Sequence, residues 1–445
     1  MTDLERHVDE LMPQVRDDLA ALVAVPSVGL PGAPREPLAD AAQLTARVLA
    51  AAGWGEVALV DVPGASPAVV GRARGSSGGG PSVLLYAHYD VMPAGPEDAW
   101  RSPPWRATER DGRLYGRGTA DDKCGIAMHA GTLRAFAGRP PVDLTVLVEG
   151  AEEAADGSLE RLLRADPERF RADCIVLADC GNRRTGEPTL TTALRGLASV
   201  DVVVSTLAAP IHSGLFGGPV PDAAIALARM LATLHDDHGD VVVPGLLHES
   251  WSGALVDRAE LSAAAGLLAG VELLGDGALD AQLFARPAVN AIGLDLPPVD
   301  GAANTLVPTA RARISARLAP GDDPDRAALR LCEHLRRVAP WGANVELAVH
   351  QTARGVRLEP GSAVEQQALA AMSRAYGREA QVAGCGGGLP LLPALVDVFP
   401  EIQPVLWGAY DDRSQVHAAD ESVDLHDLRS ALLAQVLLID ALAAG

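Results

Sequence analysis

The stretch VLLYAHYD, residues 83–90, is an apolar run of strand length that ends in polar side chains. Two more such runs follow, LTVLVEG at 144–150 and CIVLADC at 174–180, with helical periodicity between them at Lys123–Phe136 and Leu159–Arg164. Strands that are apolar throughout and alternate with helices are typical of a sheet with helices on both faces. This part of the chain therefore predicts an α/β fold.

The pattern extends outward in both directions and is interrupted once. Near Arg195 the order changes to strand, helix, strand, strand, helix, strand, which predicts a compact α+β unit, and α/β periodicity resumes at about Ala363. We predict a discontinuous α/β domain of residues 1–194 and 356–445, with a smaller α+β domain inserted at residues 195–355.

The composition restricts the class of protein. The chain has 445 residues, enough for two domains, and 48% of them are hydrophobic, which excludes a disordered chain. Its 37 basic and 58 acidic residues give a net charge of −21, so we expect neither a nucleic-acid partner nor a membrane partner. The five cysteines include no Cys-x-x-Cys pair, and no leader or spanning segment is recognisable, which favours a cytoplasmic protein with reduced thiols.

Side chains that bind metals well stand where the predicted strands end. In an α/β fold, ligand sites form at the carboxyl ends of the strands. A Gly-rich loop, GRGTADDKCG at 116–125, and a later segment, VHAADE at 416–421, contribute further residues of these types. The candidates are His88, Asp90, Asp121, Glu152, Glu153, Asp179 and His417.

These residues match the needs of a site for two zinc ions. Each ion needs about three nitrogen or oxygen ligands and an open position for water, and two neighbouring cations need an anionic bridge. We expect His88 and Asp179 to bind one ion, Glu153 and His417 to bind the other, and Asp121 to bridge them.

Two further residues are expected to assist the ligands. Asp90 follows His88 by two residues on the same strand face, where its carboxylate can accept the other imidazole N–H and fix the tautomer. Glu152 is expected to be the general base, because neighbouring side chains at an extended strand end point in opposite directions and Glu152 is thereby free of the metal.

Each motif alone also has an ordinary structural explanation. A His-x-Asp pair is most often a surface feature, a Glu-Glu pair often begins a solvated helix, and Asp121–Asp122 suits a helix N-cap. Their occurrence together at successive strand ends is what favours a metal site. The Gly-rich stretches lack the third Gly of a dinucleotide fingerprint and the Gly-Lys-Ser/Thr of a P-loop, which argues against a nucleotide site.

Six motifs, distributed over nearly the whole chain, carry a family resemblance. They are YAHYDVMP (86–93), YGRGTADDKCG (115–125), VEGAEEAADGS (148–158), LADC (177–180), PIHSGLFGG (210–218) and VHAADES (416–422). The sequence resembles the dinuclear zinc exopeptidase family of carnosine dipeptidases, carboxypeptidase G, acetylornithine deacetylase and succinyl-diaminopimelate desuccinylase. The first three motifs together are highly specific.

The resemblance implies the same five ligands and the same base, a catalytic domain with an inserted lid and dimerisation domain, and a cis peptide bond between Asp121 and Asp122. It assigns His212, which would otherwise be an ordinary loop histidine, to polarising the scissile carbonyl from the partner subunit of a homodimer. With Asp179 the sequence resembles the dipeptidase branch of the family, because deacylases and carboxypeptidases of the family usually carry Glu at this position.

The resemblance also implies contacts to the substrate. Thr305 and Arg317 lie in matching segments of the inserted domain, and Arg317 would pair with the substrate carboxylate unless it is simply a surface strand residue. Gly388 stands where dipeptidases of this type tend to carry Ser, which removes one hydroxyl contact. Cys124 stands where the family usually has Gly, either as a packing residue or as a thiol near the metal.

Together these features predict a dipeptidase with two Zn²⁺ per chain, or Mn²⁺ or Co²⁺ in their place, that attacks the amide bond of small peptides with a bridging hydroxide. An N-acyl amino-acid deacylase that uses the same site is the nearest alternative. A catalytically silent family member that acts as a binding protein is a further one, against which the intact ligand set and Glu152 argue.

Overall fold

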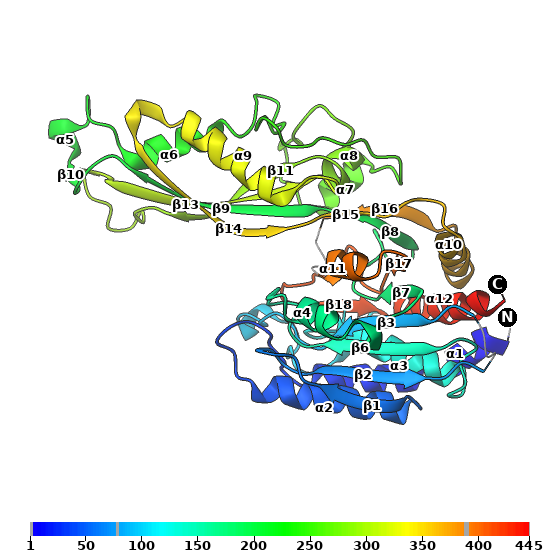
Figure 1. The fold of residues 1–445 in the computed structure, drawn as a ribbon. Coiled ribbons are helices and arrows are strands. Elements are labelled where there is room, and N and C mark those ends of the chain that lie inside the picture. The colour runs from blue at the N-terminus through cyan, green and yellow to red at the C-terminus, as the bar shows by residue number, and fades with distance from the viewer. Residues whose placement is uncertain (1–2, 77–79, 387–390, 445) are drawn as a thin grey trace. The chain divides into compact units, whose positions relative to one another are not determined.

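The structure is a computed structural model that describes residues 3–444, apart from 77–79 and 387–390. Within these residues the chain divides into two compact units (Figure 1). The first unit comprises Met1–Thr192, Leu358–Ala383 and Pro390–Gly445, and the second comprises Ala193–Arg357 and Gly384–Leu389. The first unit is therefore built from segments that precede and follow most of the second unit in the sequence.

The sheet of the first unit has the strand order β1-β2-β6-β3-β7-β17-β8. Its central strands β6, β3, β7 and β17 are parallel to one another, whereas the pairs β1–β2, β2–β6 and β17–β8 are antiparallel. The three apolar runs that predicted the fold are thus adjacent. The strands are β1 (Gly55–Val60), β2 (Ala68–Ala73), β3 (Val83–His88), β6 (Leu144–Glu149), β7 (Cys174–Leu177), β8 (Thr189–Leu194) and β17 (Gln403–Leu406).

The apolar strands of this sheet are buried on both faces. Val83, Leu85 and Ala87 of β3 belong to the main core, which they share with side chains of several helices, and the alternating Leu84 and Tyr86 are also fully buried. This agrees with the predicted α/β class. The helices are α1 (Asp3–Val23), α2 (Glu36–Ala51), α3 (Lys123–Ala135), α4 (Ser158–Ala165), α10 (Ala363–Tyr376), α11 (Leu391–Val398) and α12 (Leu425–Ala443).

The second unit is an α+β unit with an antiparallel sheet of order β11-β13-β9-β14. Alternate residues Val200, Val202 and Val204 of β9 form its core with Ile314 of β13 and with the two main helices. The elements are β9 (Gly196–Ser205), α6 (Ala223–Ala232), α7 (Arg258–Ala264), α8 (Leu279–Phe284), β11 (Ala288–Asp295), β13 (Thr309–Leu318), α9 (Pro324–Arg337) and β14 (Asn344–Ala353).

Short elements complete the two units. A small sheet of order β18-β5-β4 joins a segment near the C-terminus to the Gly-rich loop, and β10 pairs with β12 in the second unit. Their bounds are β4 (Thr108–Arg110), β5 (Arg113–Tyr115), β10 (Ile211–His212), α5 (Ser213–Phe216), β12 (Thr305–Leu306), β15 (Val356–Arg357), β16 (Gln381–Cys385) and β18 (Ser422–Asp424). No helix in the described residues has both the length and the apolar character that a membrane span requires.

Candidate metal centre

Three adjacent parallel strands bring candidate ligands to one edge of the sheet. His88 ends β3, Glu152 and Glu153 follow the end of β6, and Asp179 follows β7. Because β3 lies between β6 and β7 and runs parallel to both, these ends meet. One ligand atom each from His88, Glu152 and Asp179 lies within 4.8 Å of the others. The structure thus gathers the residues that the strand-end pattern singled out.

Asp121 lies between two histidines. Its Oδ1 is 3.0 Å from Nε2 of His88, and its Oδ2 is 2.9 Å from Nε2 of His417. Oε2 of Glu153 is 3.4 Å from the same nitrogen of His417. The peptide bond between Asp121 and Asp122 is cis, as the family resemblance implied. A carboxylate whose two oxygens face two different ligand sets has the geometry of a bridge.

The carboxylates of this cluster carry more negative charge than the protein balances. Burial, followed by the charge of Asp121, raises the pKa of Glu153 to about 8 and raises the pKa of Asp179 well above its usual range. Burial alone would also raise the pKa of Asp121, but hydrogen bonds from His417 and His88 outweigh it and lower that pKa.

One carboxylate oxygen of the cluster also lacks, within the described part of the chain, a partner that would balance its charge. Oε1 of Glu153 is buried and has no hydrogen-bond donor among the described residues. A buried carboxylate oxygen without a hydrogen-bond donor is destabilising unless a cation takes the place of the donor. Divalent cations fit this cluster, because they supply the missing positive charge and bind oxygen and imidazole nitrogen.

Glu152 is near the ligands and, like its neighbour Glu153, is partly exposed. Unlike Glu153, it lines a small cleft together with Ala155 and Ser158. Burial, with the charges of Asp121 and Asp90 behind it, raises the pKa of Glu152 above its ordinary value. A carboxylate with a raised pKa beside a cleft has the properties of a general base.

Asp90 contacts more than the sequence predicted. Nδ1 of His88 is 3.0 Å from the main-chain oxygen of Asp90 and 3.4 Å from its carboxylate Oδ1, so the main-chain oxygen is the nearer acceptor. The carboxylate accepts hydrogen bonds from the N–H of Glu152 at 3.3 Å and of Glu153 at 3.1 Å. Only glycine fits at Gly29, because a Cβ there would lie 2.2 Å from Oδ2 of Asp90. Asp90 therefore contacts both His88 and the backbone that carries the two glutamates.

Three residues singled out by the sequence lie in the second unit. His212 on β10 pairs with Thr305 on β12, and its side chain is exposed. The N–H of Gly214 donates to Nδ1 of His212 at 3.1 Å, which leaves the imidazole proton on Nε2, where it can be donated. Arg317 lies partly exposed on β13 and makes no ion pair with the described residues. Gly388 lies outside the described residues.

Cys124 is a packing residue in this structure. Its side chain is fully buried on α3, and its Sγ lies 3.1 Å from the main-chain oxygen of Ala120. Burial raises the pKa of its thiol well above the ordinary value. This environment favours the first of the two alternatives, since a reactive thiol needs exposure and a lowered pKa.

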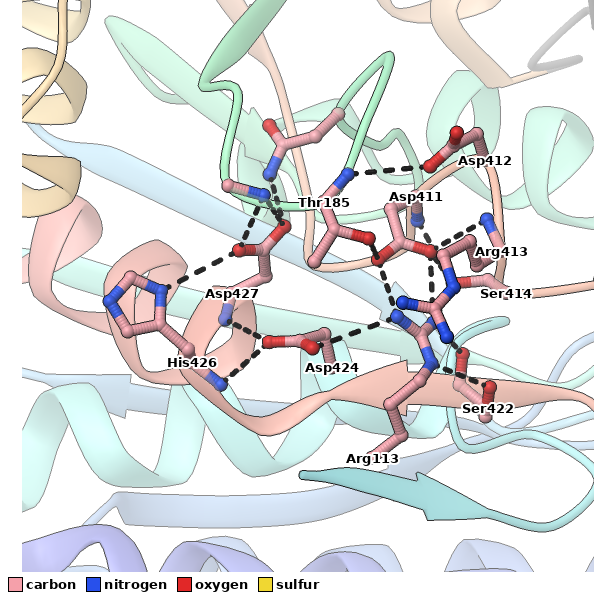
Figure 2. Close-up of polar contacts among 12 residues, drawn as sticks. Arg113, Thr185, Asp411, Asp412, Arg413, Ser414, Ser422, Asp424, His426 and Asp427 are labelled. Atoms are coloured by element: carbon pink, nitrogen blue, oxygen red, sulfur yellow. Dashed lines mark hydrogen bonds and ion pairs between the residues drawn. The ribbon is translucent and has the colours of Figure 1, made fainter. Parts of the chain in front are cut away.

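Two buried ion pairs involve residues on either side of His417 in the sequence, and sequence reasoning missed them. Arg113 forms a bidentate pair with Asp411, at 2.7 and 2.9 Å, and Thr185 donates to the same carboxylate at 2.6 Å (Figure 2). Arg117 pairs with Glu421 through one guanidinium nitrogen. The paired residues Arg113 and Asp411 are 298 positions apart, so no local pattern could have predicted the contact.

Comparisons with known proteins point to one family. Peptidase family M20/M25/M40 matches residues 84–441. The chain is 38% identical over 365 residues to a cysteinylglycine-S-conjugate dipeptidase of Corynebacterium striatum, a match that covers 80% of each protein. It is 35% identical over 186 residues to a β-Ala-His dipeptidase of Rattus norvegicus, which covers 41% of this chain and 38% of that protein.

A solved structure shares the fold. The dipeptidase Dug1p from Saccharomyces cerevisiae is 21% identical and matches with a TM-score of 0.84, covering 100% of this chain and 98% of that chain. The family match spans most of the chain and includes every residue of the metal centre described above. The chain therefore belongs to peptidase family M20/M25/M40, and its relatives place it on the dipeptidase branch.

Proposed function

We propose that this protein is a dipeptidase that uses two divalent metal ions, with zinc as the native metal. The observation that carries the proposal is the placement of Asp121, whose two oxygens face His88 and His417 at 3.0 and 2.9 Å. In this arrangement His88 and Asp179 would hold one ion, Glu153 and His417 would hold the other, and Asp121 would be a ligand of both. Nitrogen and oxygen donors without thiolate suit Zn²⁺, and Mn²⁺ or Co²⁺ are the expected substitutes.

The bound metals would lower the pKa of water and polarise the scissile carbonyl. Glu152 takes a proton from the attacking water and returns it to the leaving amine, for which its raised pKa and its place beside the cleft are suited. Asp90 keeps Nε2 of His88 available for the metal, because its main-chain oxygen accepts a hydrogen bond from the N–H at Nδ1.

Residues of the second unit are proposed to recognise the substrate. The Nε2–H of His212 donates a hydrogen bond to the oxyanion, and in this proposal His212 comes from the partner subunit of a homodimer. The guanidinium of Arg317, with Thr305, binds the carboxylate of the substrate, and its partial exposure, with no ion pair to any residue that the structure describes, supports this role. Residues 195–355 form the inserted lid and dimerisation domain in this proposal.

The proposed substrates are dipeptides with a free amino group. Relatives of this chain are named for cysteinylglycine S-conjugates and for β-Ala-His, both of which are dipeptides or their derivatives. Asp179 at the position that distinguishes the branches supports the same choice over an N-acyl amino acid. We propose a cytoplasmic enzyme without nucleic-acid or membrane partners, in keeping with its net charge of −21.

The proposal is tested by metal analysis combined with a substrate panel. Purified protein should contain close to two divalent ions per chain, and chelation should abolish hydrolysis that added Zn²⁺ restores. The panel compares a cysteinylglycine S-conjugate, β-Ala-His and unmodified dipeptides with N-acetylated amino acids. Faster hydrolysis of the acetylated compounds would favour the deacylase alternative, and full activity with one ion or none would contradict the two-metal mechanism.

A further inference from the structure

Glu421 is a buried carboxylate whose two oxygens are both occupied by N–H donors. Oε1 accepts from the backbone N–H of Ala120 at 2.9 Å and of Asp121 at 3.1 Å. Oε2 accepts from the backbone N–H of Gly118 at 3.0 Å and from the guanidinium of Arg117. The side chain is completely buried. Glu421 is thus not free to bind a metal, although it lies next to the metal centre.

These contacts join the two segments that supply neighbouring ligands. Glu421 follows His417 by four residues, and it holds the backbone of Asp121, whose Oδ2 faces Nε2 of His417 at 2.9 Å. Two more bonds fasten the same segments, from the N–H of Gly116 to the main-chain oxygen of Glu421 and from Arg117 to that of Ala418. These hydrogen bonds therefore fix the position of the Asp121 loop relative to the segment that carries His417.

A negative charge at this place requires an explanation. The metal centre already contains several buried carboxylates, and Glu421, whose side chain is also buried, adds one more. Such a group is tolerated only where it accepts several hydrogen bonds, and here all four of its donors, three backbone N–H groups and the guanidinium of Arg117, belong to the Gly-rich loop that carries Asp121. The carboxylate of Glu421 therefore fixes the backbone conformation of that loop.

We infer that Glu421 is a positioning residue of the metal centre, which fixes the backbone of Asp121 so that its two carboxylate oxygens face His88 and His417. The inference rests on the proposed two-metal function and goes beyond it, because Glu421 is neither a ligand nor a catalytic residue there. Groups that orient metal ligands without touching the metal typically change metal affinity by about 10–100-fold when they are replaced.

The same segment offers a matched control. Asp411 is also buried, also pairs with an arginine, and accepts hydrogen bonds from Arg113, Thr185, Arg413 and Ser414 (Figure 2). None of these four partners is a proposed metal ligand. Replacement of Asp411 by Asn therefore breaks a comparable buried ion pair of the segment without touching the Asp121 loop.

The experiment compares Glu421→Gln with Asp411→Asn. Both changes keep the size of the side chain and remove its charge, and in Glu421→Gln the amide N–H₂ would face an N–H donor. Metal-free protein is titrated with Zn²⁺ against a chromophoric chelator, and the thermal midpoint of the metal-free form is recorded. We expect Glu421→Gln to weaken zinc binding by about 10–100-fold, with hydrolysis restored by excess Zn²⁺. Asp411→Asn should lower the thermal midpoint and leave zinc affinity unchanged.

Zinc affinity that falls equally in both variants, or in neither, would overturn the inference. If Glu421→Gln does not fold, Glu421→Asp replaces it, because this change keeps the charge but shortens the reach to the three backbone N–H groups. Wild-type zinc affinity in Glu421→Asp would then contradict the positioning role. A wild-type protein that binds no metal or cleaves no dipeptide would contradict the proposed function itself, and that result is read from the wild type alone.

Discussion

Two groups of histidine and carboxylate side chains in the first unit have similar composition but different surroundings. In the first group, Asp121, Glu153 and His417 come within 4.8 Å of one another, and in the second, Asp424, His426 and Asp427 do so. We call the second group the α12 cap, because Asp424 is the N-cap residue of α12. Judged by residue types alone, both groups could bind a metal ion equally well.

Hydrogen bonding separates the two groups. In the α12 cap, Asp424 accepts from the N–H of His426 and Asp427, and Asp427 accepts from the N–H of Gly186 and the side-chain amide of Asn182 (Figure 2). These carboxylates already have donors, as expected at a helix N-terminus. In the metal centre, one oxygen of Glu153 is buried without a donor among the described residues. Unsatisfied oxygens, more than clustered residues, indicate where a cation fits.

The largest difference should separate one histidine of the metal centre from one histidine of the α12 cap. His88→Ala removes a buried ligand, so we expect the loss of at least one ion per chain and a fall in turnover on the order of 10³-fold or more. His426→Ala removes an exposed side chain whose Nδ1 is 3.7 Å from Asp427, and metal content and turnover should stay at wild-type values. Metal analysis and dipeptide hydrolysis on both proteins make the comparison. Loss of metal from His426→Ala would show that the α12 cap also binds an ion.

Within the metal centre, the two neighbouring glutamates should behave differently. Glu152→Gln keeps the size of the side chain and removes the proton acceptor, so metal content should persist while turnover falls by about 10²–10⁴-fold. Glu153→Gln should first weaken metal binding, because its carboxylate is the proposed ligand. Metal content and turnover measured at increasing Zn²⁺ distinguish the two. Exchanged phenotypes would mean that the roles of Glu152 and Glu153 are reversed.

Much of the metal centre could be predicted because its residues follow strands whose apolar pattern is local. His88, Glu152 and Asp179 stand at the ends of such runs, and parallel neighbours bring their ends together. The contact of His417 with Asp121 could not be derived from the strand pattern, because it joins distant segments, and it was expected from the ligands that a two-metal site needs. The cis peptide at Asp121 followed from the resemblance alone.

The supporting contacts were out of reach of sequence reasoning. Asp90 was expected to accept from His88, but its carboxylate also accepts from two backbone N–H groups that no spacing rule identifies. Glu421 stands in the VHAADES motif, yet its position four residues after His417 does not reveal that its acceptors face the Asp121 loop. The short strands β8, β15 and β16 were not predicted, because they have little apolar periodicity of their own.

A smaller loss of activity is expected for His212, which lies outside the first unit. Removal of an oxyanion donor costs about 10²–10³-fold in turnover, so His212→Ala should lose that much while it keeps both metals. A mixture of Glu152→Gln and His212→Ala chains tests whether His212 acts from the partner subunit. If it does, a mixed dimer contains one intact site and part of the activity returns. Subunit exchange without recovered activity would exclude action from the partner.

The smallest effect on turnover, and a distinct effect on stability, should come from the Arg113–Asp411 pair beside the α12 cap. Burial alone would raise the pKa of Asp411, but hydrogen bonds from Arg113 and Thr185 outweigh it and lower that pKa. Its contribution to stability is therefore fully present above the unfolded-state pKa of about 3.9 and is lost as the pH falls through the lower pKa of the folded state.

Breaking one partner of a buried pair costs about 3–5 kcal/mol, so Asp411→Asn should lose that much free energy of unfolding at pH 7 while turnover at low temperature is kept. The difference from wild type should begin to shrink below about pH 4, where the carboxylate of unfolded Asp411 takes up a proton, and should disappear only below the lower pKa of the folded carboxylate. Denaturant unfolding at several pH values measures this, with the exposed neighbour Asp412→Asn as the control that should stay near wild type. If the difference in free energy of unfolding between Asp411→Asn and wild type stays constant across the acid range, then packing, and not the charge of Asp411, accounts for the stability that this side chain contributes.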